Sequence, residues 1–159
     1  MKNPLNCRQI NILLVEDNPG DIRLTQEVLK AGKIKNKLNI VMDGEEAISY
    51  LKRIDKYADV QLPDIILLDL NLPKKDGREV LSEIKSDPLL MLIPVIILTT
   101  SAAAQDILST YAHHANYYIT KPVDFDQLIR VIRSIENFWL SIVKLPEMKS
   151  LEKDGNNPQ

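Results

Sequence analysis

Short runs of apolar residues, rich in isoleucine, valine and leucine, recur along this chain and are separated by segments with helical spacing. The runs lie around residues 10–16, 38–42, 64–69, 94–99 and 117–120. They are nearly continuous rather than alternating, which is typical of parallel strands that helices cover on both faces. The pattern therefore predicts five strands that alternate with helices.

Helix start signals follow several of these runs. Asn18 before Pro19 offers an N-cap and a proline in the first helical turn. Asp43, Asp76 and Asp124 are each followed three residues later by Glu or Gln, a spacing that permits a capping box. The order of elements predicts an α/β domain with a flavodoxin-like, doubly wound five-stranded parallel sheet of order 2-1-3-4-5 and five helices.

The last helix is predicted to be extended. Apolar residues keep helical spacing from Asp124 to about Lys144, which is ~32 Å at 1.5 Å per residue and longer than covering the sheet requires. Its final turns carry four large apolar side chains, Phe138, Trp139, Ile142 and Val143. Exposed apolar patches of this kind are typical of association surfaces, so we expect a homodimer. The alternative is that these side chains fold back on the same subunit.

Composition sets the protein class. The 159 residues are 45% hydrophobic and 26% charged, which is ordinary for a globular domain, and the net charge of -2 gives no electrostatic basis for binding nucleic acid or an anionic membrane. The single cysteine excludes an intramolecular disulfide. No apolar run approaches the ~20 residues of a membrane helix, and the N-terminus lacks the apolar stretch of a signal peptide. We expect a cytoplasmic protein with one domain over 1–145 and a polar, disordered tail over 146–159.

Four of the predicted strands end in groups that suit phosphate chemistry. Glu16 and Asp17 follow the first strand, Asp69 ends the third, Thr99 ends the fourth, and Lys121 follows the fifth. In a doubly wound parallel sheet the carboxyl ends of the strands line one crevice, where ligands bind. The sequence therefore predicts a site for phosphate and metal at this edge.

The carboxylates have more than one interpretation. Glu16, Asp17 and Asp69 would repel one another in a half-buried pocket, and a hard cation such as Mg²⁺ would relieve that repulsion. The alternative for the first two is a solvated loop and helix-cap pair. Asp69 is a candidate nucleophile that would form an acyl phosphate, a candidate metal ligand, or a cap for the loop that follows.

Three further side chains are candidates. Lys121 can pair with a phosphoryl oxygen as a compact positive charge, and its bond to Pro122 raises the chance of a cis peptide that would aim the lysine inward; the alternative is a surface lysine before a turn. The hydroxyl of Thr99 can bind a phosphoryl oxygen, or the side chain can simply pack at the strand end. Tyr118 is either an ordinary half-buried aromatic or a rotamer switch.

Residues 10–140, approximately, resemble a two-component response regulator receiver domain. The matching motifs are Glu16-Asp17, the run from Asp69 to Gly77, Pro94 with Thr99 five residues on, and Lys121-Pro122 with Tyr118 three residues before. The resemblance implies that Asp69 accepts phosphate from a sensor histidine kinase. It also implies Mg²⁺ held by Asp17, Asp69 and the backbone carbonyl of Asn71, with Glu16 acting mainly through water.

The same resemblance implies a coupled switch pair, Thr99 and Tyr118, and a phosphate-binding lysine, Lys121. Several segments further resemble the small phytochrome-associated response regulators of cyanobacteria, among them Val15 to Asp21, Tyr118 to Val123 and Phe138 to Leu140. Two positions depart from many receivers: His114 replaces a glycine, and Thr100 replaces a small residue. We expect Thr100 to narrow access to the phosphorylated aspartate and slow its hydrolysis.

The expected function is a stand-alone signalling protein that responds through the surface of the fourth helix, fifth strand and fifth helix. Such a protein is a phosphoacceptor and not an enzyme acting on other substrates. The main alternative is a magnesium-dependent phosphatase or phosphotransferase that works through an aspartyl phosphate. Those enzymes usually need a second acid two residues after the nucleophile to protonate the leaving group, and this chain has Asn71 there. A scaffold with a degenerate site is disfavoured because all the site residues are present.

Overall fold

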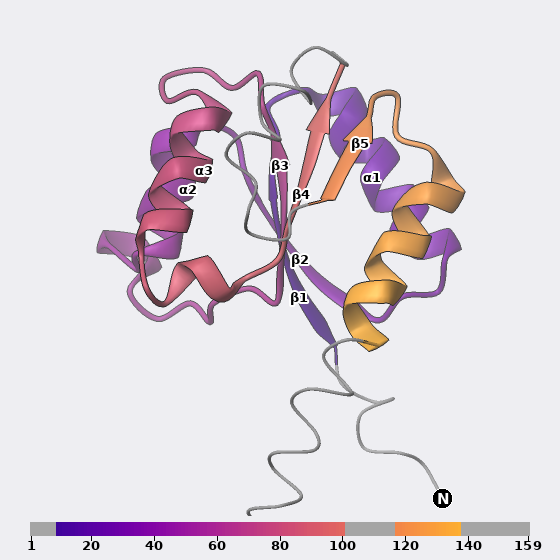
Figure 1. Cartoon of the computed structure of the whole chain (residues 1–159), viewed down its shortest axis with the longest axis horizontal. Coiled ribbons are helices and arrows are strands. Elements are labelled where there is room, and N and C mark those ends of the chain that lie inside the picture. The colour runs from indigo at the N-terminus through magenta and orange to yellow at the C-terminus, as the bar shows by residue number, and fades with distance from the viewer. Residues whose placement is uncertain (1–8, 101–116, 138–159) are drawn as a thin grey trace, which may run out of the picture.

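The computed structural model describes residues 9–100 and 117–137, which form a five-stranded parallel sheet between two layers of helices (Figure 1). The strands are β1 (Ile10–Val15), β2 (Asn36–Val41), β3 (Ile65–Asp69), β4 (Val95–Thr99) and β5 (Tyr117–Thr120). Their order is β2-β1-β3-β4-β5, and every neighbouring pair is parallel. This confirms the predicted fold and strand order.

The helices are α1 (Pro19–Ala31), α2 (Gly44–Leu51), α3 (Gly77–Ser86) and a helix over 125–137, with short 3₁₀ helices η2 (Asp55–Tyr57) and η3 (Leu90–Leu92). The predicted fourth helix falls in 101–116, outside the described residues. The predicted apolar patch of Phe138, Trp139, Ile142 and Val143 also lies outside them, as does the predicted tail. In the described ranges, no helix combines the length and the hydrophobicity needed to cross a membrane.

Successive residues of the central strands point to opposite faces of the sheet, and each face has its own core. Leu13 and Val15 join the cluster under α2 and α3, whereas Ile12 and Leu14 join the cluster under α1 and the 125–137 helix. Figure 1 shows these two helix pairs on opposite sides of the sheet. Burial on both faces explains why β3 and β4 are apolar almost throughout: every residue of both strands is buried.

The edge strand β2 begins at Asn36, two residues before its predicted start. The prediction began at the first apolar residue, Leu38. Because β2 pairs with β1 alone among the described strands, one of its edges has no strand beside it there. An edge strand of this kind can include polar residues such as Asn36 and Lys37 without disturbing the core.

Side-chain caps begin the helices as predicted, with one difference. Asn18, Asp43 and Asp124 each accept a hydrogen bond from the backbone N–H three residues on, at 2.8 to 3.0 Å. Asp76 instead accepts from the N–H of Arg78 at 2.7 Å, so the predicted hydrogen bond from the N–H of Glu79 is wrong. Beside this cap, the N–H of Gly77 donates to the Leu70 carbonyl at 3.0 Å.

Candidate functional site

The parallel register brings the four predicted strand ends to one edge of the sheet. Val15 pairs with Leu68 just before the acidic residues of both strands, and Thr99 pairs with Thr120 on the other side. Backbone hydrogen bonds link the loops to neighbouring strands: the N–H of Glu16 donates to the Val41 carbonyl at 3.0 Å. The N–H of Lys121 likewise donates to the Thr99 carbonyl at 2.8 Å. Backbone hydrogen bonds therefore fix the backbone positions from which the Glu16 and Lys121 side chains extend.

Three carboxylates meet at this edge. Glu16, Asp17 and Asp69 each present one oxygen, and these oxygens lie within 4.8 Å of one another. Glu16 and Asp69 are buried, whereas Asp17 is exposed. Oxygen ligands at this spacing suit a hard divalent cation, and the exposed side leaves room for the waters that Mg²⁺ retains. The donor set therefore fits the metal that the sequence predicts.

Lys121 supplies the positive charge of the site. Its ammonium donates to Glu16 Oε1 at 2.7 Å and to Asp21 Oδ2 at 2.9 Å, and it forms an ion pair with Asp69 Oδ2 at 3.4 Å. The lysine side chain is only 8% exposed. The peptide bond before Pro122 is cis, as predicted. The Lys121 side chain therefore lies largely buried beside these carboxylates, and its alternative interpretation as a surface lysine is wrong.

Burial and neighbouring charges shift the pKa of both partners in this pair. Burial is the main reason that the pKa of Glu16 rises to about 7; Asp69 raises it further, and Lys121 opposes the rise. Burial alone would lower the pKa of Lys121, but its hydrogen bonds to Glu16 and Asp21 outweigh burial and raise it. The lysine therefore stays charged, whereas the Glu16 carboxyl can exchange a proton near neutral pH.

The loop after β3 holds Asp69 in place. The N–H of Asn71 donates to Asp69 Oδ1 at 3.1 Å, and the loop is packed between the first residues of α2 and α3. A Cβ added to Gly77 would lie 2.5 Å from the Asp69 carbonyl oxygen, and one added to Gly44 would lie 2.0 Å from the Lys75 carbonyl oxygen. Only glycine permits this close approach of the backbones.

The two predicted switch residues lie on adjacent strands. Thr99 is buried at the end of β4, and Tyr118 of β5 pairs in register with Ile97. Tyr118 is half-buried against the α2–α3 core, and burial raises the pKa of its hydroxyl. Thr100, the departure noted in the sequence, is exposed beside the site, whereas His114 lies outside the described residues.

Asp21 is a site residue that sequence reasoning missed. The sequence analysis included it only as the last residue of a segment that carries the family resemblance, but its side chain contacts the ammonium of Lys121. The available signal was its position: Asp21 lies in the first turn of α1, just after the acidic pair at the end of β1. Helix geometry turns its side chain back toward the strand ends.

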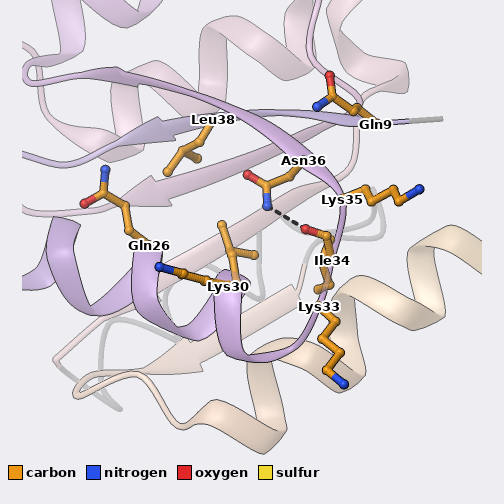
Figure 2. Close-up of a pocket in the computed structure, with 9 residues that line it drawn as sticks. Gln9, Gln26, Lys30, Lys33, Ile34, Lys35, Asn36 and Leu38 are labelled. Atoms are coloured by element: carbon orange, nitrogen blue, oxygen red, sulfur yellow. Dashed lines mark hydrogen bonds between the residues drawn. The ribbon is translucent and has the colours of Figure 1, made fainter. Parts of the chain in front are cut away.

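A hollow of about 520 Å³ lies at the other end of β1 and β2, between the C-terminal turn of α1 and the start of β2 (Figure 2). Lys30, Lys33 and Lys35 line it, together with Asn36, whose amide donates to the Ile34 carbonyl at 2.8 Å. Figure 2 shows the amino groups of Lys33 and Lys35 pointing away from the hollow. The amino groups of these two lysines therefore do not point together into the hollow. The hollow is lined by none of the acidic-site residues.

The acidic edge can support one kind of chemistry well. A buried carboxylate, Asp69, lies beside two further acids that can hold a cation and beside an ammonium that can neutralise an incoming anion. This combination favours transfer of a phosphoryl group to an aspartate, because the positive charges offset the repulsion between carboxylate and phosphoryl oxygens.

Comparison with known proteins agrees with this arrangement. Residues 12–133 match the family described as the response regulator receiver domain. The chain is 50% identical over 135 residues to the response regulator Rcp1 of Synechocystis sp., covering 85% of this chain and 92% of that protein. The phosphorylated cyanobacterial phytochrome response regulator RcpA is 52% identical, with a TM-score of 0.70, covering 84% of this chain and 96% of that one. The Mn²⁺-bound form of Rcp1 is 48% identical, with a TM-score of 0.68 and the same coverage.

Proposed function

We propose that this chain, which belongs to the response regulator receiver domain family, carries a signal by accepting a phosphoryl group on Asp69. The observation that carries the proposal is the position of Asp69: a buried carboxylate at the end of β3, among two other acids and 3.4 Å from the ammonium of Lys121. The donor is the phosphohistidine of a sensor histidine kinase.

The transfer is a single displacement at phosphorus. A carboxylate oxygen of Asp69 forms the new O–P bond as the N–P bond to the histidine breaks, and the imidazole keeps the bonding electron pair and takes up a proton from solvent. Lys121 reduces the repulsion between the entering oxygen and the phosphoryl oxygens, and Asn71 holds Asp69 through its backbone N–H. The product is an acyl phosphate on Asp69.

The residues that would hold Mg²⁺ are Asp17, Asp69 and the backbone carbonyl of Asn71, with Glu16 contributing mainly through water. When bound, the cation offsets the negative charge of the phosphoryl oxygens. Support comes from the three carboxylate oxygens within 4.8 Å and from the similar protein Rcp1, whose Mn²⁺-bound form is known.

The response would pass through Thr99 and Tyr118. A phosphoryl group adds charge and acceptor oxygens that the Thr99 hydroxyl can bind only in the phosphorylated state. Movement of Thr99 toward the phosphate would vacate space that Tyr118 can enter, which would change the surface of the fourth helix, β5 and the fifth helix.

The proposed kinase partner is a phytochrome. The relatives RcpA and Rcp1 support this, since the former is a phytochrome response regulator that resembles this chain over most of its length.

We further propose that the protein is a cytoplasmic homodimer. Its receiver domain spans 1–145 and its tail spans 146–159. The subunits associate through the apolar side chains of the last helix, Phe138, Trp139, Ile142 and Val143. The helical spacing of those apolar residues supports the interface, and gel filtration of Trp139→Ser against the wild type tests it.

A magnesium-dependent phosphatase is the weaker candidate. It would need an acid near Asp69 to protonate a leaving group. The residue two positions on is Asn71, which is exposed and whose amide has no acidic proton to give.

Incubation with acetyl phosphate and Mg²⁺, followed by intact-mass measurement, tests the proposed function. The wild type is expected to gain one phosphoryl group that is lost in alkali, and the gain should disappear in Asp69→Asn and on chelation of Mg²⁺. Glu27→Gln, which removes an exposed acid of α1, is the matched control and should behave as the wild type. An unmodified wild type, or an equally modified Asp69→Asn, would overturn the proposal.

A further inference from the structure

An ammonium has three N–H groups, and three carboxylates lie close to the ammonium of Lys121. Its contacts are Glu16 Oε1 at 2.7 Å, Asp21 Oδ2 at 2.9 Å and Asp69 Oδ2 at 3.4 Å. Asp21 differs from the other two because it is not part of the group of acids that converge on the cation position. In the part of the chain that the structure describes, its carboxylate contacts Lys121, so we expect it to act on the site through that lysine.

The three carboxylates differ in how readily they can release the lysine. Glu16 has no exposed side-chain surface, and losing the ammonium would leave its buried carboxylate without that positive charge. Asp69 is itself the group that becomes esterified. The Asp21 side chain is 31% exposed, so water can take the place of the ammonium there. Asp21 is therefore the partner that Lys121 can give up most easily.

We propose that Asp21 is a positioning residue that competes with the phosphoryl group for Lys121. The inference rests on the proposed function of Asp69. In the unphosphorylated protein Asp21 shares the ammonium with Glu16 and Asp69; in the phosphorylated protein the lysine turns one N–H from Asp21 to a phosphoryl oxygen. The negative charge of Asp21 also repels the phosphoryl oxygens, so both effects weaken the phosphorylated state.

Local structure allows Asp21 to be changed without undoing the helix. Its backbone N–H is capped by Asn18 Oδ1 at 3.0 Å, and its carbonyl accepts from the Thr25 hydroxyl at 2.9 Å. Neither bond uses the Asp21 carboxylate. Asp21→Asn, which has almost the same shape, is therefore expected to fold and to remove only the charge.

The test measures binding of beryllofluoride, a mimic of the phosphoryl group, at saturating Mg²⁺ by calorimetry. Asp21→Asn should bind it about fivefold more tightly than the wild type, the size expected for an ion pair of a partly exposed carboxylate. Asp21→Ser, a second neutral variant, should also bind beryllofluoride more tightly than the wild type. Asp21→Glu keeps the carboxylate and should restore weaker binding. Glu27 lies on the same helix but pairs with Arg23 rather than Lys121, so Glu27→Gln removes a charge from that helix and should change the affinity less than twofold.

Thermal unfolding without beryllofluoride is measured on the same proteins, since a merely structural role would lower that stability and leave the affinity unchanged. Unchanged or weaker binding by both neutral variants would overturn the competition, as would an equal gain in Asp21→Glu or Glu27→Gln. Failure of the wild type to bind beryllofluoride at all is a different result: it would remove the proposed function of Asp69 and this inference with it.

Discussion

Replacing Lys121 by methionine removes the positive charge of the site while keeping a long side chain. In the wild type the ammonium lies 2.7 Å from Glu16 Oε1 and 3.4 Å from Asp69 Oδ2, and both carboxylates are buried. Removing one partner of a buried ion pair usually costs about 3–5 kcal/mol. Glu16, whose pKa is already raised to about 7 by burial, can take up a proton and offset part of this. We therefore expect a loss of about 3 kcal/mol in the free energy of unfolding.

The assay is urea unfolding, followed by circular dichroism in the presence of a chelator. Lys37→Met, which replaces an exposed lysine of β2, is the control and should change stability by less than about 0.5 kcal/mol. Adding Mg²⁺ should narrow the gap between Lys121→Met and the wild type, because a bound cation replaces the missing positive charge. A loss below about 1 kcal/mol for Lys121→Met would contradict this expectation, since the buried carboxylates would then not depend on this lysine.

The loss should also depend on pH. Because the pKa of Glu16 is raised in the folded protein, its contribution to stability falls as the pH rises from its ordinary 4.5 to about 7 and then levels off. Without Lys121 that pKa rises further, and the fall continues above pH 7. The difference between Lys121→Met and the wild type should therefore be larger at pH 8 than at pH 6. An equal difference at both values would mean that Glu16 is not the group left unpaired.

Three further changes test other parts of the site and fold. Gly77→Ala forces a Cβ to 2.5 Å from the Asp69 carbonyl oxygen; it should cost about 2 kcal/mol of stability in urea unfolding and weaken Mg²⁺ binding in calorimetry. Thr99→Ala should still be phosphorylated by acetyl phosphate, but the change in amide hydrogen exchange of β5 that follows phosphorylation should shrink. Burial and the hydrogen bond to Glu46 raise the pKa of Tyr57 to about 12. The contribution of this hydroxyl to the free energy of unfolding is therefore fully present below pH 10 and is lost as the pH rises through 12. Tyr57→Phe should lose less stability than the wild type over that interval.

The sequence predicted where most of the candidate side chains would meet, because those residues lie at strand ends. A run of apolar residues that stops at Asp69 or at Thr99 shows where a buried strand ends, and parallel pairing then places those ends together. The caps at Asn18 and Asp43 were predictable for a similar reason, since each depends on residues only three positions apart.

What the sequence did not reveal depends on contacts between distant residues. Asp21 and Lys121 are 100 positions apart, and only the tertiary fold brings the start of α1 and the residue after β5 together. The close approach of Gly77 to Asp69 depends on the path of a single loop, which local spacing does not specify. The start of β2 at Asn36 was missed because an edge strand can include polar residues, so apolar composition marks its boundary poorly.

Phosphorylation at Asp69 is tested most directly by identifying the residue that carries the phosphoryl group. Borohydride reduces an aspartyl phosphate to homoserine, so treating the protein after incubation with acetyl phosphate and Mg²⁺ marks the modified residue for peptide mass spectrometry. We predict homoserine at position 69 and unchanged acids at positions 16, 17 and 21. Homoserine at any of those three positions, or at none of the four, would contradict it.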